Sequence, residues 1–248
     1  MQLFSALAKL YTTMLRLNNL TASVADKTIL KKISFNFEKG KIYAVMGPNG
    51  SGKSTLASVI AGHPAYAIRH GTIYFNKENI TDLEPEKRVQ KGIFMTFQSP
   101  PSLSGVTIYQ LMRYSMQGKK DPVVIRSEVK KYAEKLKVPE ILLNRSLNEG
   151  FSGGERKKME VLQAVILDPT LIIFDEIDTG VDIDALKTIA KFIKLMHNKN
   201  KTFILITHYN RLLKYLRPDV VLILRNGTIE KTGNMTLANH IEKHGYGS

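Results

Sequence analysis

The stretch GPNGSGKST, residues 47–55, follows directly on the apolar run IYAVM. From Gly47 to Ser54 it fits the pattern G-x-x-x-x-G-K-[ST]. In that pattern backbone N–H groups surround phosphates, the lysine reaches the β and γ phosphates, and the first hydroxyl binds Mg²⁺. The next residues, STLASVIAG, predict a helix whose N-terminal dipole points at the same anion. Strand, loop, lysine and helix in this order predict a site for a nucleoside triphosphate.

The remaining segments predict an α/β fold around this loop. TLIIFDE and KTFILITH are almost continuous apolar runs, as in parallel strands buried on both faces, and DALKTIAKFIKLMHNKN between them predicts a crossover helix. PVVIRSEVKKYAEKLKV has helical spacing of apolar residues in mid-chain, and Asn226-Gly227 is a strong hairpin signal. We therefore expect a mostly parallel sheet with a helical insertion and β-hairpin pieces at both ends, folded as one compact domain with two lobes.

Composition limits the classes of partner and chemistry. The formal charge is +14, but the basic residues are scattered, which favours a solvated surface, polyphosphate binding or an acidic partner over direct binding of nucleic acid. There are no cysteines, which excludes disulfides and thiolate ligation of a metal by this chain and suits a reducing cytoplasm. No apolar run is long enough for a membrane span. The opening MQLFSALAKLYTT fits either a short amphipathic helix or a misassigned start before Met14.

LIIFDE supplies a second element of the expected site. Four apolar residues end in Asp175, where a carboxylate can meet the Mg²⁺ held by Ser54 and the phosphates. Glu176 follows at the carboxyl end of the strand, where open α/β sheets bind ligands. A carboxylate there can orient or deprotonate an attacking water.

FSGGE, residues 151–155, opens a helix and so offers a second anion site. It lies about 20 residues before LIIFDE and about 100 after the loop lysine. With GPNGSGKST, the glutamine of MTFQSP, FSGGE, the Asp-Glu pair of LIIFDE and the histidine of LITHY in this order, the chain resembles the ATP-binding cassette family from about Met14 to its end.

The resemblance implies a fold and a set of roles. The fold would be an ABC ATPase core with an antiparallel β subdomain and a helical signature subdomain, with residues 14–97 and 165–248 as core lobe, 98–164 as helical lobe, and 1–13 as an extension. Glu176 would be the general base, His208 would contact the γ-phosphate, and Gln98 would reach both the metal and the attacking water. Mg²⁺ would be held by Ser54, Gln98 and Asp175. The residues that would bind ATP are Gly47, Pro48, Asn49, Gly50, Ser51, Gly52, Lys53, Ser54 and Thr55, with Ser152, Gly153 and Gly154 acting on the ATP of a second copy.

Finer features resemble the SufC branch of that family, the ATPases of Suf iron–sulfur cluster assembly. These are NEGFSGGE, DEIDTGVDIDALK and THYNRLL followed by RPD. Phe151, Glu155 and the non-aromatic Val24 depart from the wider family pattern but are tolerated in this branch, whereas FQSPPSLSGV matches it only loosely. The resemblance implies SufB- and SufD-like scaffold partners and a transient ATP-bound homodimer with DTGVD, residues 178–182, at the crossing point. A transporter subunit is the alternative, and a switch protein on nucleic acid a distant third.

Overall fold

The computed structural model describes residues 12–208 and 210–247. These residues form two compact units, which we call the core unit and the helical unit. The helical unit comprises residues 96–169 and 177–196, and the core unit holds the other described residues. Residues 177–196, expected in the core lobe, thus group with the helical unit. Residues 1–11 of the expected extension lie outside the described residues, and its last residue, Thr13, begins the first strand.

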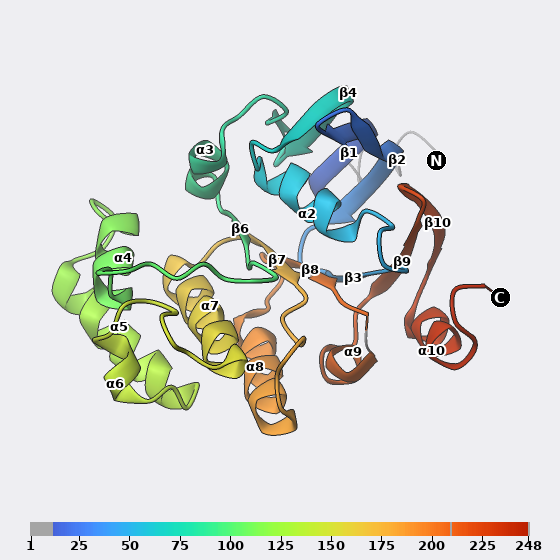
Figure 1. The fold of residues 1–248 in the computed structure, drawn as a ribbon. Coiled ribbons are helices and arrows are strands. Elements are labelled where there is room, and N and C mark those ends of the chain that lie inside the picture. Colours follow the sequence, from blue (N-terminus) through green and yellow to red (C-terminus); the bar gives the residue numbers. More distant parts are fainter. Residues whose placement is uncertain (1–11, 209, 248) are drawn as a thin grey trace. The chain divides into compact units, whose positions relative to one another are not determined.

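A six-stranded sheet forms one half of the core unit (Figure 1). Its order is β10-β9-β3-β8-β7-β6, and all neighbours are parallel except β10, which returns antiparallel to β9. Every residue of β7 and β8 is buried, which confirms the expectation drawn from their apolar runs, and every residue of β3 is buried as well. The strands are β3 (Ile42–Met46), β6 (Ile93–Met95), β7 (Leu171–Asp175), β8 (Thr202–Ile206), β9 (Val220–Arg225) and β10 (Thr228–Gly233).

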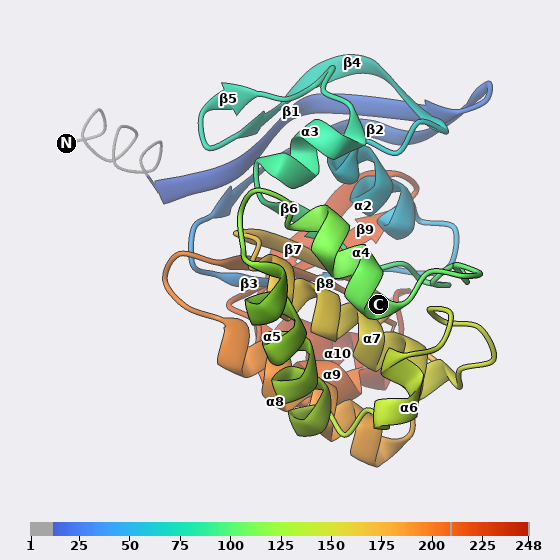
Figure 2. The same ribbon diagram turned by 90° about the vertical axis from the view of Figure 1, so that its left-hand side faces the viewer.

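A four-stranded antiparallel sheet, order β2-β1-β4-β5, forms the other half of the core unit (Figure 2). Helix α2 (Lys53–Ala61) contacts strands of both sheets, and one apolar cluster is built from all three layers. The hairpins expected at both ends of the chain are present. The first, β1 and β2, lies in the antiparallel sheet, whereas the second, β9 and β10, lies at the edge of the parallel sheet. The antiparallel strands are β1 (Thr13–Val24), β2 (Lys27–Glu38), β4 (Tyr66–Phe75) and β5 (Glu78–Asn79).

Short helices complete the core unit. Arg88 of α3 is almost fully buried and donates to the carbonyls of Val59 and Ile60, so it satisfies carbonyl groups in the last turn of α2. Its guanidinium also binds the carbonyls of Thr81 and Leu83, which ties the β5–α3 connection to the same point. The three helices are α3 (Pro85–Gln90), α9 (Asn210–Leu216) and α10 (Met235–His244).

The helical unit is built on α7, which packs against α4, α5 and α8. The helix expected in PVVIRSEVKKYAEKLKV is present as α5, begun by Asp121, whose side chain accepts from the N–H of Val123, and by Pro122 in the first turn. No helix of the described residues is both long and apolar enough to cross a bilayer. The helices are α4 (Ile108–Ser115), α5 (Pro122–Lys135), α6 (Glu140–Leu143), α7 (Gly153–Leu167) and α8 (Ile183–Met196).

Candidate functional site

The phosphate loop leads from the end of β3 into α2. Gly50 and Gly52 have φ angles of 74° and 103°, which a residue with a Cβ adopts only under strain. Gly52 is the N-cap of α2 and offers no side chain, so the first-turn N–H groups have no capping oxygen from it. The first turn of α2 also contains no acidic residue. The loop therefore presents amide donors and a helix dipole to an anion.

Lys53 lies inside this loop and is 5% exposed. Its Nζ donates to the carbonyl oxygens of Gly47, at 2.9 Å, and Pro48, at 3.0 Å. Burial lowers the pKa of Lys53, and the nearby carboxylates of Glu176 and Asp175 oppose that change. A triphosphate would supply the anionic partners that a buried ammonium needs.

Ser54 and Asp175 meet at the start of α2 and the end of β7. Ser54 Oγ donates to Asp175 Oδ1 at 3.2 Å, and Asp175 is buried. Both are hard oxygen ligands of the kind that Mg²⁺ prefers, and Mg²⁺ is usually held by few protein groups together with substrate phosphates. No group of three or more histidines and carboxylates in the described part of the chain is placed to hold a metal. The residues present therefore fit Mg²⁺ that is bound jointly with a nucleotide.

Glu176 and His208 lie side by side at the same edge of the sheet. His208 Nε2 is 2.8 Å from Glu176 Oε1, and the N–H of Glu176 donates to the carbonyl of Ile206. Glu176 has φ = 48°, a left-handed conformation that is uncommon outside glycine and often marks functional positions. Its side chain is largely buried, while His208 is partly exposed. The carboxylate thus has a fixed partner that can orient it.

Gln98 belongs to the helical unit, in the segment after β6. Two charged side chains of α7 hold its main chain: Lys157 Nζ donates to the carbonyls of Phe97 and Gln98, and Glu160 accepts the N–H of Phe97. Lys157 and Glu160 are each 3% exposed and lie 3.7 Å apart. Neither residue was predicted from the sequence. Their only signal is an opposite-charge pair at helical spacing, which is far more common on exposed helix faces.

The FSGGE motif forms the start of α7. Ser152 is the N-cap, its Oγ accepts the N–H of Glu155, and Glu155 Oε2 accepts the N–H of Ser152 at 2.7 Å. An accepting hydroxyl keeps its own O–H for donation to another group. A Cβ on Gly153 would come within 2.9 Å of the carbonyl oxygen of Gly180, so the first glycine permits close packing inside the helical unit. Phe151 is buried and anchors the motif.

The predicted residues therefore form two groups, each described within its own unit. At the carboxyl edge of the parallel sheet lie residues 47–55, Asp175, Glu176 and His208. In the helical unit lie Gln98, held by α7, and Ser152, Gly153 and Gly154 at the start of the same helix. The chemistry that the first group can perform is binding of a metal-bound polyphosphate beside a carboxylate.

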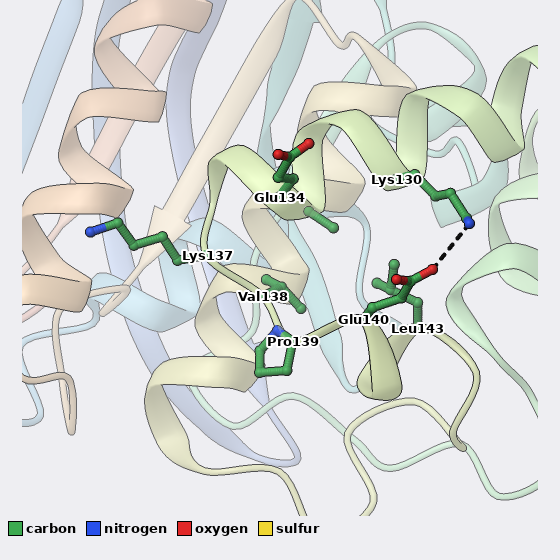
Figure 3. Close-up of a pocket in the computed structure, with 8 residues that line it drawn as sticks. Lys130, Glu134, Lys137, Val138, Pro139, Glu140 and Leu143 are labelled. Atoms are coloured by element: carbon green, nitrogen blue, oxygen red, sulfur yellow. Dashed lines mark ion pairs between the residues drawn. The ribbon is translucent and has the colours of Figure 1, made fainter.

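A hollow lies on the helical unit, lined by residues of α5, α6 and the segment between them (Figure 3). It measures about 610 Å³, and Lys130 and Glu140 form an ion pair of 3.0 Å across it. None of the residues expected to bind nucleotide lines it. Its lining residues are Lys130, Ala133, Glu134, Lys137, Val138, Pro139, Glu140 and Leu143.

Comparisons with known proteins identify the family of this chain. Residues 30–179 match the protein family described as ABC transporter. A protein of Cyanophora paradoxa named probable ATP-dependent transporter ycf16 is 43% identical over 95% of this chain and 94% of its own length. A protein of Escherichia coli named probable ATP-dependent transporter SufC is 41% identical over 94% of this chain and 98% of its own length.

Two solved structures have the same fold. A nucleotide-free ATP-binding cassette from an ABC transporter has a TM-score of 0.76 and 28% identity, covering 93% of this chain and 95% of that one. The dimeric cassette MJ0796, bound to ADP and phosphate after hydrolysis, has a TM-score of 0.77 and 21% identity, covering 90% of this chain and 99% of that one. The expected α/β cassette fold is thus confirmed. The chain belongs to the ABC transporter family as an ATP-binding, ATP-hydrolysing cassette, and within that family it is similar to SufC and ycf16.

Proposed function

We propose that this chain is the ATPase of a Suf-type machinery for iron–sulfur cluster assembly in the cytoplasm. Two copies would close around ATP and thereby change the conformation of SufB- and SufD-like scaffold proteins. The observation that carries the proposal is the identity of 41% to SufC, spread over 98% of that protein. The motifs NEGFSGGE and DEIDTGVDIDALK, which resemble that branch, support it further.

The geometry supports a division of labour among the site residues. Lys53 and the amides of residues 49–55 would bind the phosphates. Ser54 and Asp175, which already touch, would hold Mg²⁺ together with Gln98. When bound, Mg²⁺ neutralises charge that develops on the phosphates. Glu176 would accept the proton of the attacking water, and His208, 2.8 Å away, would orient Glu176 and contact the γ-phosphate.

The FSGGE motif would act on the nucleotide of a second copy. Ser152 is exposed, keeps a hydroxyl proton for donation, and stands at the positive end of the 15-residue helix α7. Contacts to the γ-phosphate would exist only in the closed dimer, so ATP would favour closure and hydrolysis would reverse it. The turn at residues 178–182, which packs beside Gly153, would lie where the two copies cross.

A subunit of a membrane transporter is the alternative function. The names of the relatives, probable ATP-dependent transporters, favour it. Both functions use the same ATPase site and differ in the partner. We expect no direct binding of nucleic acid.

Affinity capture of the tagged chain from its native host distinguishes the partners. Scaffold proteins of the SufB and SufD type should copurify from the membrane-free fraction, and a permease recovered from membranes instead would contradict the proposal. Phe97 opens the segment FQSPPSLSGV, residues 97–106, which we infer to contact the partner. Its side chain is 46% exposed, and α7 holds its main chain. Phe97→Asp should therefore reduce capture, whereas Leu195→Asp, at an exposed position of α8, should not.

A further inference from the structure

The C-terminal segment contacts the phosphate loop, a contact that no motif predicts. Helix α10 ends at His244, and Gly245, with φ = 75°, turns the chain so that Tyr246 follows. The Tyr246 hydroxyl accepts the N–H of Gly47 at 3.1 Å. Gly47 is the first residue after β3, where the sheet ladder ends, so this N–H would otherwise need another partner. The first amide of the loop is thus held by a side chain 199 residues further along.

Tyr246 is itself held in place. Arg225 Nη1, at the end of β9, donates to the carbonyl of Tyr246 at 3.1 Å. Burial raises the pKa of the Tyr246 phenol, so the hydroxyl stays protonated at neutral pH and keeps a proton to donate as well.

The same segment also reaches the neighbourhood of His208. Tyr246 and Ile241 line a cavity of about 460 Å³ together with His208 and Met46. Asn210, two residues after His208, is buried, and its Nδ2 donates to Asn239 Oδ1 and Glu242 Oε2 of α10. Residues 235–246 therefore contact both the entry of the phosphate loop and the helix that follows His208.

The backbone at Gly47 has little room to move if its hydrogen bond to Tyr246 is lost. A Cβ at this position would lie 2.1 Å from the carbonyl oxygen of Leu224, so the loop entry already packs closely on β9. Its direction is then set by close packing on one side and the tyrosine hydroxyl on the other.

We propose that Tyr246 is a positioning residue of the nucleotide site, whose hydroxyl fixes the entry of the phosphate loop for binding of the phosphates. The inference rests on the proposed roles of residues 47–55, but it is independent of which protein is the partner. It predicts that removal of one oxygen atom at Tyr246 weakens nucleotide binding without removing the loop or its lysine.

The test compares Tyr246→Phe with Tyr43→Phe. Tyr43 makes the same kind of bond, since its hydroxyl accepts the N–H of Glu38 at 2.6 Å, but it does not touch the loop. Loss of one such hydrogen bond is worth about 1 kcal/mol, a factor of about five. We expect the Kd of Mg-ADP, measured by calorimetry on the full chain, to rise roughly fivefold for Tyr246→Phe and to stay at the parent value for Tyr43→Phe. The melting temperatures should fall for both.

A second variant tests the same contact in case Tyr246→Phe fails to fold. Arg225→Met keeps the hydroxyl but releases the main chain of Tyr246, and it should also raise the Kd of Mg-ADP. Parent-like affinity in Tyr246→Phe, or an equal loss of affinity in Tyr43→Phe, would overturn the proposal. If the parent itself failed to bind Mg-ADP, the fault would lie with the phosphate-loop assignment, and both proposals would fall together.

Discussion

At the scale of single residues, Glu176 differs from the neighbouring Asp175 in having a left-handed backbone conformation. A glutamate at φ = 48° is held there by the bond from its N–H to Ile206 and by His208 beside its carboxylate. Strain of this kind costs about 1–3 kcal/mol and persists only where surrounding contacts enforce it. The sequence shows that an acid follows Asp175, but not that its main chain turns left-handed to meet a histidine.

Glu176→Gln should abolish most hydrolysis while leaving ATP binding intact. An amide keeps the size and can still contact His208, but it cannot accept a proton, so kcat should fall by about 100-fold or more. ATP should then accumulate on the protein, and size-exclusion chromatography should show a dimer. Glu78→Gln, at an exposed ion pair with Lys91, is the control. Parent-like turnover in Glu176→Gln would refute the role of Glu176 as general base.

Gly227→Ala should destabilise the fold far more than Gly50→Ala. Both glycines have positive φ, at 81° and 74°, so both substitutions incur about 1–2 kcal/mol of backbone strain. A Cβ at Gly227 would in addition lie 1.9 Å from the carbonyl oxygen of Ile29, whereas nothing lies within 4 Å at Gly50. Overpacking adds about 1–3 kcal/mol, which urea unfolding can resolve. Equal losses would mean that the turn at residues 226–227 shifts freely.

At the scale of secondary-structure elements, the pattern of apolar residues predicted which strands form, but it did not predict which parts of the fold each helix contacts. The buried runs of β7 and β8 and the hairpin at Asn226-Gly227 are where the sequence analysis expected them, because these signals are local. Helix α10 was missed, since its apolar residues are few and its role depends on contacts with Asn210 and on leading the chain to Tyr246, which bonds Gly47. The grouping of α8 with the helical unit was missed for a similar reason, because it depends on packing against α7.

The start of α7 should be sensitive to acid through Glu155. The backbone and side-chain hydrogen bonds from Ser152 hold the pKa of Glu155 below its usual value. A lowered pKa in the folded state stabilises the protein above the unfolded value of about 4.3, and this contribution disappears as the pH falls through the folded value. Glu155→Gln should therefore lower the melting temperature at pH 7, and by less as the pH falls below the unfolded value. Glu149→Gln, at an exposed position just before the motif, is the control for loss of one negative charge.

At the scale of the whole molecule, the two groups of site residues stand in different units of the chain. Residues 47–55, Asp175, Glu176 and His208 occur in the core unit, whereas Ser152, Gly153 and Gly154 occur in the helical unit. In the proposed dimer, one complete site needs the core unit of one copy and the helical unit of the other. Defects in the two groups should then complement each other between chains.

A mixture of Lys53→Ala and Gly154→Asp should hydrolyse ATP although neither variant does so alone. Gly154 tolerates a side chain, because its Cβ would lie an ordinary 3.6 Å from Ala185, and an acid near a helix start is compatible with folding. Its charge would nevertheless repel a phosphate. The mixed dimer contains one site with an intact loop and an intact signature. The double variant mixed with either single variant is the control, and no recovery in the main mixture would argue against sites shared between copies.

The order of the parallel sheet also sets how much of the chain must be synthesised before the strand that carries the phosphate loop has its neighbours. The strand that carries the phosphate loop, β3, pairs with β8 and β9, both of which are encoded after residue 200. Until those residues leave the ribosome, β3 lacks both of its neighbours in the sheet. We therefore expect a chain that terminates before residue 202 not to hydrolyse ATP, although its lysine and glycines are complete.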